Sequence, residues 1–311
     1  MAPASKNHHY IPRSILRQFC FEGESLLLFD AMFPERGYRQ RSIDRAFQKF
    51  HGNSIEYENG ERSDHVEKWL SDNIDSPLGA ILSEGNGNLE LLLETQSKRI
   101  LARYLVTLLF RAPRGREALV EVPDSISDAM SLVFKLAKMF GVEEQIDVFG
   151  QGVPSDLRSA LEVSLPTLIS DQQVEQFMDF ELVLATPQGH EVFCIFDFPM
   201  MRYDDPRNAL FDDMHEYWFV LSPKIAACFM AKTSLPVDGC IFQIPDTHVR
   251  RMNFDFAMRS QFVAANCPVV LHQTVRHLGR FPTGRSLDET NAAMFERGGK
   301  YFPVSCSKCS P

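Results

Sequence analysis

The sequence predicts an α+β fold, in the form of a mainly helical single domain with one small antiparallel sheet. Short extended segments at residues 26–43 and 181–230 flank a middle third in which apolar residues recur at helical spacing. The chain has 311 residues and is 44% hydrophobic, which is enough to bury a substantial core. We expect residues 1–280 to form one compact domain and residues 281–311 to form a loosely ordered tail.

The N-terminal part, residues 1–50, combines a histidine-rich motif with a predicted hairpin. Residues 26–30 are predicted as one strand and residues 38–43 as its partner, because the Phe-Pro-Glu-Arg-Gly segment between them has turn composition. The helical body is then expected over residues 55–178.

The first helix of this body is predicted over residues 64–81. Asp64 and Glu67 fit a capping box at its start, and Pro77 is expected to bend or divide it. Three further helical patterns follow, at residues 95–110, 125–140 and 155–177.

Strands and a closing helix are predicted for residues 179–265, which are rich in β-branched and aromatic side chains. Residues 181–186 and 191–196 flank a Pro-Gln-Gly-His turn and predict a hairpin. Two more strands are expected at residues 217–221 and 225–230, and a helix at residues 251–265.

The composition limits the classes of partner. With 41 acidic and 32 basic residues the net charge is −9, which argues against non-specific binding of nucleic acid by the whole surface. Residues 1–50 carry an excess of basic side chains, so a local site for nucleic acid or another anionic partner stays open. No apolar signal segment or membrane-spanning run is found. We therefore expect a cytoplasmic protein with no membrane partner.

The seven cysteines are odd in number and scattered, so we expect reduced core residues instead of a disulfide framework. Cys306 and Cys309 form a C-x-x-C pair in the tail. A structural zinc site ordinarily needs four ligands, and no second pair lies nearby. Two free thiols are the prediction for this pair.

The most distinctive segment begins at Asn7 and places His8, His9, Arg13 and Arg17 within a few positions of one another. The pattern H-x-[VI]-P-x-x-x-L-x-x-F is completed by Pro12, Leu16 and Phe19. Other features follow it in order, namely Arg111, Asp197-Phe198-Pro199 and Leu221-Ser222-Pro223. This series resembles the family called domain of unknown function 4238, over most of residues 5–265. The family has no accepted activity, so the resemblance implies a fold more than a chemistry.

The chain departs from that family at its central loop. Where the family often has Thr-Ser-Asp-Asn-Pro, this chain reads Ile195-Phe196-Asp197-Phe198-Pro199. The two changes remove hydroxyl and amide groups. Asp197 is therefore the polar group of this loop that we carry into a candidate site.

The leading hypothesis is a metal-dependent hydrolase acting on an anionic, phosphate-containing substrate such as nucleic acid or a nucleotide. In it His9 is the general base, Asp197 supplies a carboxylate, and His8 binds a divalent cation, Mg²⁺ or Mn²⁺. Adjacent residues of an extended chain point to opposite faces, so at most one of the two imidazoles lines a given site. The cationic side chains assigned to catalysis are Arg13 and Arg111, and those assigned to substrate binding are Arg17 and Arg103.

A second candidate site is acidic. Asp212-Asp213-Met214-His215-Glu216 has the D-D-x-x-E form of the magnesium–diphosphate motif of terpene cyclases, in which carboxylates share cations. Asp212, Asp213 and Glu216 are therefore candidate metal ligands of a cyclase-like lyase acting on a prenyl diphosphate. Strands predicted on both sides disagree with an all-helical cyclase, and an acidic solvated loop is the alternative.

The remaining hypothesis is a non-catalytic macromolecular interaction module. Here His9 binds main-chain groups, the arginines pair with carboxylates, and the polar groups hold the N-terminal segment against the helices. Burial separates the two classes, because catalytic groups converge on an open cleft whereas structural groups are closed off and paired. The hydrolase hypothesis requires His9, Arg111 and Asp197 to meet around one solvent-accessible hollow.

Overall fold

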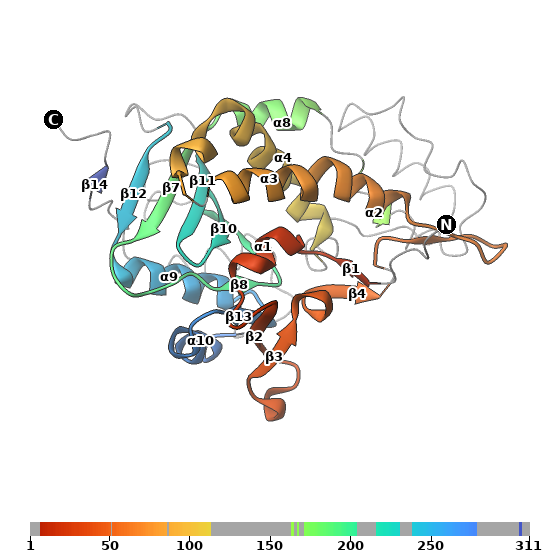
Figure 1. Cartoon of the computed structure of the whole chain (residues 1–311), viewed down its shortest axis with the longest axis horizontal. Helices are drawn as coiled ribbons and strands as arrows, with labels where there is room; N and C mark the ends of the chain where they lie inside the picture. The colour runs from red at the N-terminus through yellow and green to blue at the C-terminus, as the bar shows by residue number, and fades with distance from the viewer. Residues whose placement is uncertain are drawn as a thin grey trace.

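The structure is a computed structural model that describes residues 7–50, 52–85, 87–112, 163–164, 167, 171–203, 216–230, 238–278 and 305–306 (Figure 1). Helical residues make up 44% of the described chain and strand residues 28%, and the strands form four sheets. The class is α+β, but the expectation of a mainly helical domain with one small antiparallel sheet is wrong. Several strands are buried on both faces, so they lack the alternating pattern by which a half-buried strand is recognised.

The largest sheet has six strands in the order β14-β12-β7-β11-β10-β9. Neighbouring strands are antiparallel except β12 and β7, which are parallel. All six residues of β11 are buried, because the sheet is covered on both faces. The strands are β7 (Glu181–Pro187), β9 (Met200–Tyr203), β10 (Glu216–Ser222), β11 (Ile225–Met230), β12 (Ile241–Ile244) and β14 (Ser305–Cys306).

Two helices, α4 (Thr95–Arg111) and α8 (Asp171–Met178), cover one face of this sheet (Figure 1). Tyr104 of α4 packs edge-on against Phe219 of β10, with ring centroids 5.9 Å apart. Phe177 of α8 packs in the same way against Phe229 of β11, at 5.7 Å. The helix predicted over residues 95–110 is confirmed, and α8 confirms the end of the one predicted over 155–177.

The second large sheet has the order β3-β2-β13-β8 and is entirely antiparallel. Its strand β2 alternates buried and half-buried residues, which matches a sheet with one side more accessible. The hairpin predicted over residues 26–43 is confirmed as β2 and β3. The four strands are β2 (Ser25–Asp30), β3 (Arg39–Ser42), β8 (Ile195–Phe196) and β13 (Phe262–Ala265).

The helix predicted over residues 64–81 is present, with one irregularity. It consists of α2 (His65–Leu70), the π-helical turn η3 (Ser71–Asp75) and α3 (Ser76–Gly85). Pro77 has no N–H to donate, and the widened turn lies immediately before it. The element is therefore distorted at the proline without being divided.

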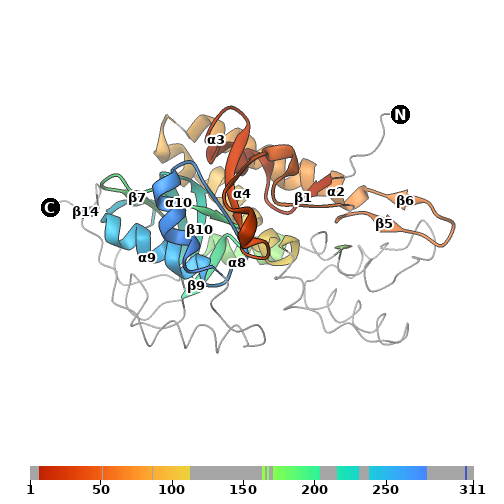
Figure 2. The same ribbon diagram turned by 90° about the horizontal axis from the view of Figure 1, so that it is seen from below.

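The other elements are short. Two paired ladders join β1 (Asn7–His9) to β4 (Gln48–Phe50) and β5 (Ile55–Glu56) to β6 (Arg62–Ser63), and the second projects from the body (Figure 2). The helices are α1 (Arg13–Gln18), α9 (Asp246–Ala257) and α10 (Pro268–Val275), and the 3-10 turns are η1 (Pro34–Arg36), η2 (Ile43–Arg45) and η4 (Leu89–Leu93).

Two local expectations are wrong. Residues 191–196 do not pair with β7, because the Asp246 carboxylate accepts the N–H groups of residues 189, 190 and 191 and ties this segment to the start of α9. The helix expected over residues 251–265 ends at Ala257. Residues 262–265 instead form β13 between β2 and β8, because pairing with two strands overrides their helical spacing.

The helix expected over residues 125–140 lies outside the described residues. So does the tail at residues 281–311, apart from Ser305 and Cys306 of β14. Cys194, Cys228 and Cys240 are buried, and Cys194 and Cys228 form no disulfide, as expected of reduced core cysteines. No helix in the described ranges combines the length and hydrophobicity needed to cross a bilayer.

Candidate functional site

The two N-terminal imidazoles bind different main-chain groups. β1 pairs with β4, and Nδ1 of His8 accepts the N–H of Asn53 at 2.9 Å. Nε2 of His9 lies 2.8 Å from the carbonyl oxygen of Ile43, so that nitrogen carries the proton and donates it. Both side chains are buried, with 1% of His8 and 8% of His9 exposed. The alternation of an extended chain thus sends them to separate surroundings.

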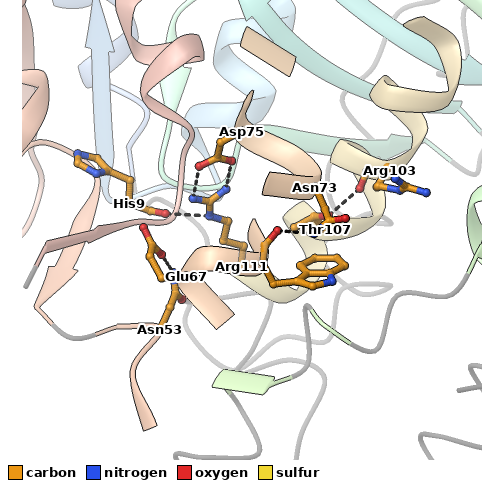
Figure 3. A network of polar contacts seen from close by, with 9 residues as sticks. His9, Asn53, Glu67, Asn73, Asp75, Arg103, Thr107 and Arg111 are labelled. Carbon is orange, nitrogen blue, oxygen red and sulfur yellow. Dashed lines mark hydrogen bonds and ion pairs between the residues drawn. The ribbon is translucent and has the colours of Figure 1, made fainter. Parts of the chain in front are cut away.

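Arg111, near the end of α4, is the centre of a buried polar network (Figure 3). Its Nε donates to the main-chain oxygen of His9 at 2.8 Å. Its Nη1 and Nη2 donate to the two carboxylate oxygens of Asp75 at 2.5 and 2.8 Å. Only 1% of Arg111 is exposed. Its fork geometry fits a planar carboxylate, so the guanidinium holds η3, α4 and β1 together.

The electrostatics of the pair follow from its burial. Loss of hydration alone would lower the pKa of Arg111, but the Asp75 carboxylate outweighs it and the pKa is raised. Arg111 is therefore permanently charged and neutralised within the chain. Figure 3 shows the His9 imidazole pointing away from the guanidinium that binds its main chain.

Glu67, Asn53 and Asp64 extend the network towards β5 and β6. Nδ2 of Asn53 donates to Oε2 of Glu67 at 2.6 Å. Asp64 Oδ1 accepts the hydroxyl of Ser54 at 2.5 Å and lies 3.9 Å from Nε2 of His8. Across the residues that the structure describes, no three His, Cys, Asp or Glu side chains are arranged to hold a metal ion. The assignment of His8 as a metal ligand stays a prediction.

The protonation state of His9 is set by its surroundings. Burial lowers its pKa, and the positive charges of Arg13 and Arg111 act in the same direction, against the hydrogen bond to Ile43. The imidazole is therefore neutral near pH 7. Because Nε2 carries the proton, Nδ1 holds the free electron pair.

The other predicted cationic groups lie at the surface in ion pairs. Their partners come from different elements, so they do not converge on one site. The pairs are Arg13 with Asp44, Arg17 with Glu24 at 3.5 Å, and Arg103 with Asp171 at 2.8 Å.

Asp197 follows β8 and binds main-chain N–H groups. Its Oδ1 accepts from Gln261 at 3.0 Å and from Phe262 at 3.3 Å. Asp197 therefore fixes the start of β13 and is 8% exposed. The hydrolase hypothesis requires His9, Arg111 and Asp197 to lie around one hollow. Arg111 contacts the main chain of His9, whereas the Asp197 carboxylate binds the start of β13.

Of the acidic motif, Glu216 alone lies within the described residues; Asp212 and Asp213 fall outside them. Glu216 is the first residue of β10, is 0% exposed, and accepts the indole N–H of Trp218 at 2.7 Å. A strand position inside a six-stranded sheet differs from the helical setting of a cyclase motif.

Sequence reasoning missed two features. One is a hollow of about 510 Å³ between the end of α1, the turn between β10 and β11, and the residue after β13. Gln18, Ser222 and Asn266 line it. The family-like segments that contain Gln18 and Ser222 thus meet in space, and chain order alone gave no signal of it.

The second feature is a surface formed by the β2–β3 hairpin and α10, here called the hairpin–α10 surface. The phenol oxygen of Tyr38 lies 2.6 Å from Nδ1 of His272 and joins the two elements. Met32, Phe33, Tyr38 and Val269 define the surface and are 60, 43, 41 and 65% exposed.

A family model described as "Protein of unknown function (DUF4238)" matches residues 7–270. The match covers every described element from β1 to α9 and the start of α10. No curated protein and no solved structure matches the chain.

Proposed function

Because the chain belongs to the DUF4238 family, whose function is unknown, we propose from its geometry that it is a non-catalytic module that binds another protein. One observation carries the proposal. Of the five large hydrophobic side chains exposed in the described ranges, Met32, Phe33 and Tyr38 belong to the β2–β3 connection, and Tyr38 contacts His272 of α10, the helix that carries Val269. Single exposed hydrophobic residues are ordinary, whereas a contiguous group of them is typical of an interaction site.

The charges around this surface indicate the chemistry of the partner. The guanidinium of Arg36 lies 4.1 Å from the centre of the Phe33 ring, and Arg276 contacts His272 at 3.2 Å. Glu35, 3.7 Å from Arg36, offsets part of this charge. Arginine and aromatic side chains are enriched in the groups that dominate binding energy. We infer an acidic partner segment that also carries apolar side chains.

The buried network supports a structural part for the N-terminal motif. Arg111 and Asp197 bind groups of the same chain, and neither offers an open cationic or acidic site. Their contacts hold β1, α1 and β13 in place. Of these elements, β13 pairs with β2 and leads into α10, so it supports the hairpin–α10 surface.

The experiment uses fluorescence anisotropy with two synthetic peptides, one of alternating Glu and Leu and one in which Lys replaces Glu. We expect the acidic peptide to bind, and the double variant Met32→Ser/Val269→Ser to bind it about tenfold more weakly, a change of about 1.4 kcal/mol. Phe21→Ser is the matched control, because Phe21 is 39% exposed and lies outside the surface. Equal binding of both peptides, or an equal loss in the control, would contradict the proposal.

A second candidate is the metal-dependent hydrolase, which one observation favours. His9 is neutral, its Nε2 is fixed by Ile43, and its Nδ1 holds a free electron pair, as a general base requires. The test is hydrolysis of bis(p-nitrophenyl) phosphate with Mg²⁺, Mn²⁺ or chelator. This candidate requires metal-dependent turnover that His9→Ala abolishes and that Arg62→Ala, which breaks a surface ion pair with Glu56 on the β5–β6 ladder, retains. Wild-type protein without turnover in either metal would eliminate it.

A further inference from the structure

The hollow beside α1 has the size and lining of a small-molecule site. Its volume of about 510 Å³ lies in the usual range of such sites. It is built by segments far apart in the chain, each held by a regular element: Gln18 ends α1, Thr186 lies in β7, Lys224 lies between β10 and β11, and Asn266 follows β13. Regular elements far apart in the chain therefore position the lining of this hollow.

Asn266, one of the lining residues, has a side-chain oxygen without a partner among the residues that the structure describes. The Oδ1 atom of Asn266 is buried and accepts no hydrogen bond within the described chain. A buried acceptor left unpaired costs about 1–3 kcal/mol, so it calls for a group that the protein does not itself supply. Gln18 adds a second carboxamide to the lining. Each carboxamide can both donate and accept, as a hydroxyl group does.

The lining also includes two hydroxyl groups. Each makes one hydrogen bond within the protein and can make a further one to a ligand. Oγ of Ser222 accepts the N–H of Lys224 at 3.2 Å, so its own proton is available to donate. Oγ1 of Thr186 donates to the carbonyl of Phe242 at 3.3 Å, so its electron pairs are available to accept. The lining thus presents donors and acceptors at several points, which suits a ligand with several hydroxyl groups.

The charge of the lining selects among such ligands. Its nine residues include one cation, Lys224, and no carboxylate. Lys224 Nζ donates to the main-chain oxygen of Glu191 at 3.3 Å and keeps two N–H groups, so it can attract a carboxylate on the ligand, whereas its charge repels an ammonium group. The lining has no guanidinium fork for a phosphate dianion, and its single lysine matches one negative charge. Leu89 and Ile225 contribute apolar walls for the carbon skeleton.

We propose that this hollow binds a polyhydroxylated monocarboxylate of the sugar-acid class, with its carboxylate on Lys224 and its hydroxyl groups on Gln18 and Asn266. The site is independent of the hairpin–α10 surface and of any chemistry at His9. The N-terminal motif then helps to position this site. Arg111 binds the main chain of His9, and the chain continues from there through Pro12 into α1, which ends at Gln18.

The test is isothermal titration calorimetry of the full chain with glucuronate, glucose and glucosamine. We expect glucuronate to bind at least about tenfold more tightly than glucose, and glucosamine not to bind. Lys224→Met should weaken glucuronate about tenfold, and Asn266→Leu should weaken glucuronate and glucose alike. Lys68→Met is the matched control, because Lys68 is exposed on α2.

Several results would overturn the assignment. They are no heat with glucuronate, equal affinity for glucosamine, and an equal effect of Lys224→Met and Lys68→Met. If Asn266→Leu does not fold, as judged by circular dichroism, Gln18→Leu replaces it, since Gln18 is only half-buried. Peptide binding at the hairpin–α10 surface is measured separately, so the two proposals can fail independently.

Discussion

Arg111, in the last turn of α4, donates its Nε–H to the main-chain oxygen of His9, 2.8 Å away and 102 positions earlier in the chain. The guanidinium therefore binds the backbone of the histidine motif and leaves the imidazole to bind Ile43. A histidine and an arginine side by side suggest a catalytic pair. Here Arg111 lies beside His9 because it binds the main chain of that residue. The remaining donors of the guanidinium fork face Asp75, at the end of a π-helical turn that brings this carboxylate to α4.

Arg111→Met should be among the most destabilising single changes in the chain. It leaves the Asp75 carboxylate without its partner and the His9 carbonyl without its donor. Breaking a buried pair by removing one member costs about 3–5 kcal/mol. The free energy of unfolding, measured by urea titration, should fall by this order.

The control is Arg103→Met, which breaks a solvent-exposed pair with Asp171 on the same helix. Such surface pairs contribute about 0–1 kcal/mol, so the loss should be much smaller. Equal effects of the two variants would mean that Arg111 is not a structural centre. Arg111→Lys keeps the charge and loses the fork, so it should lie between the two.

His9 should make the stability depend on pH. Burial lowers its pKa in the folded state below the usual 6.5, so the unfolded chain binds the proton more tightly. The contribution of neutral His9 is therefore complete above about pH 6.5 and is lost as the pH falls towards the lowered pKa. His9→Gln keeps an N–H donor for Ile43 but does not titrate.

The measurement is the free energy of unfolding of wild type and His9→Gln at about pH 7.5 and about pH 5.5. The wild type should lose more stability between these values than the variant. Burial also lowers the pKa values of His65 and His248. The stability of the variant should therefore still fall with pH, but less than that of the wild type. An equal loss of unfolding free energy in both proteins would show that the lowered pKa of His9 does not contribute to the pH dependence.

The sequence alone predicted the elements that have one buried and one exposed face, because such elements show a regular spacing of apolar residues. Residues 26–43 alternate and carry turn residues at the right place, and residues 95–110 repeat with helical spacing. Both became the predicted elements. The fully buried strands β7 and β11 carry no such alternation, and β13 exists because it is paired on both sides, so sheet content was underestimated.

The candidate site was harder to predict, because its partners are non-local. The sequence singled out His9 and Arg111, which the structure places in contact, but nothing near either one in the sequence indicates Asp75 or Ile43. The neighbours of Asn266 at the hollow are likewise set by tertiary packing. A motif identifies residue types, whereas burial and partners decide whether a side chain is available to a ligand.

Asp197 should stabilise the start of β13. Asp197→Ala removes the acceptor of the N–H groups of Gln261 and Phe262 and should cost about 1–3 kcal/mol, the penalty for leaving such groups unpaired. Asp197→Asn keeps one oxygen and should cost less. Hydrogen exchange of residues 261 and 262 measures the effect locally. Unchanged exchange in Asp197→Ala would contradict this assignment.

Gly189 should be required because of Asp246. A Cβ atom at position 189 would collide with the Asp246 carboxylate, which accepts the N–H of Gly189 at 3.2 Å and those of the next two residues. Gly189→Ala should therefore push the carboxylate away from the N–H groups that it accepts and destabilise the chain by about 1–3 kcal/mol, the cost of losing hydrogen bonds to a charged group. Thermal and urea unfolding measure it.

A double-mutant cycle separates this collision from a general effect of alanine. In Asp246→Ala the obstructing carboxylate is absent, so adding Gly189→Ala should cost much less than it does in the wild type. Gly87→Ala is the control, because a Cβ there meets open space and should be neutral or slightly stabilising. Additive effects of Gly189→Ala and Asp246→Ala would mean that the two residues do not interact. A double variant that costs less than the sum of the two single variants would show that the residues interact, as expected if the contact with α9 holds the segment that follows β7.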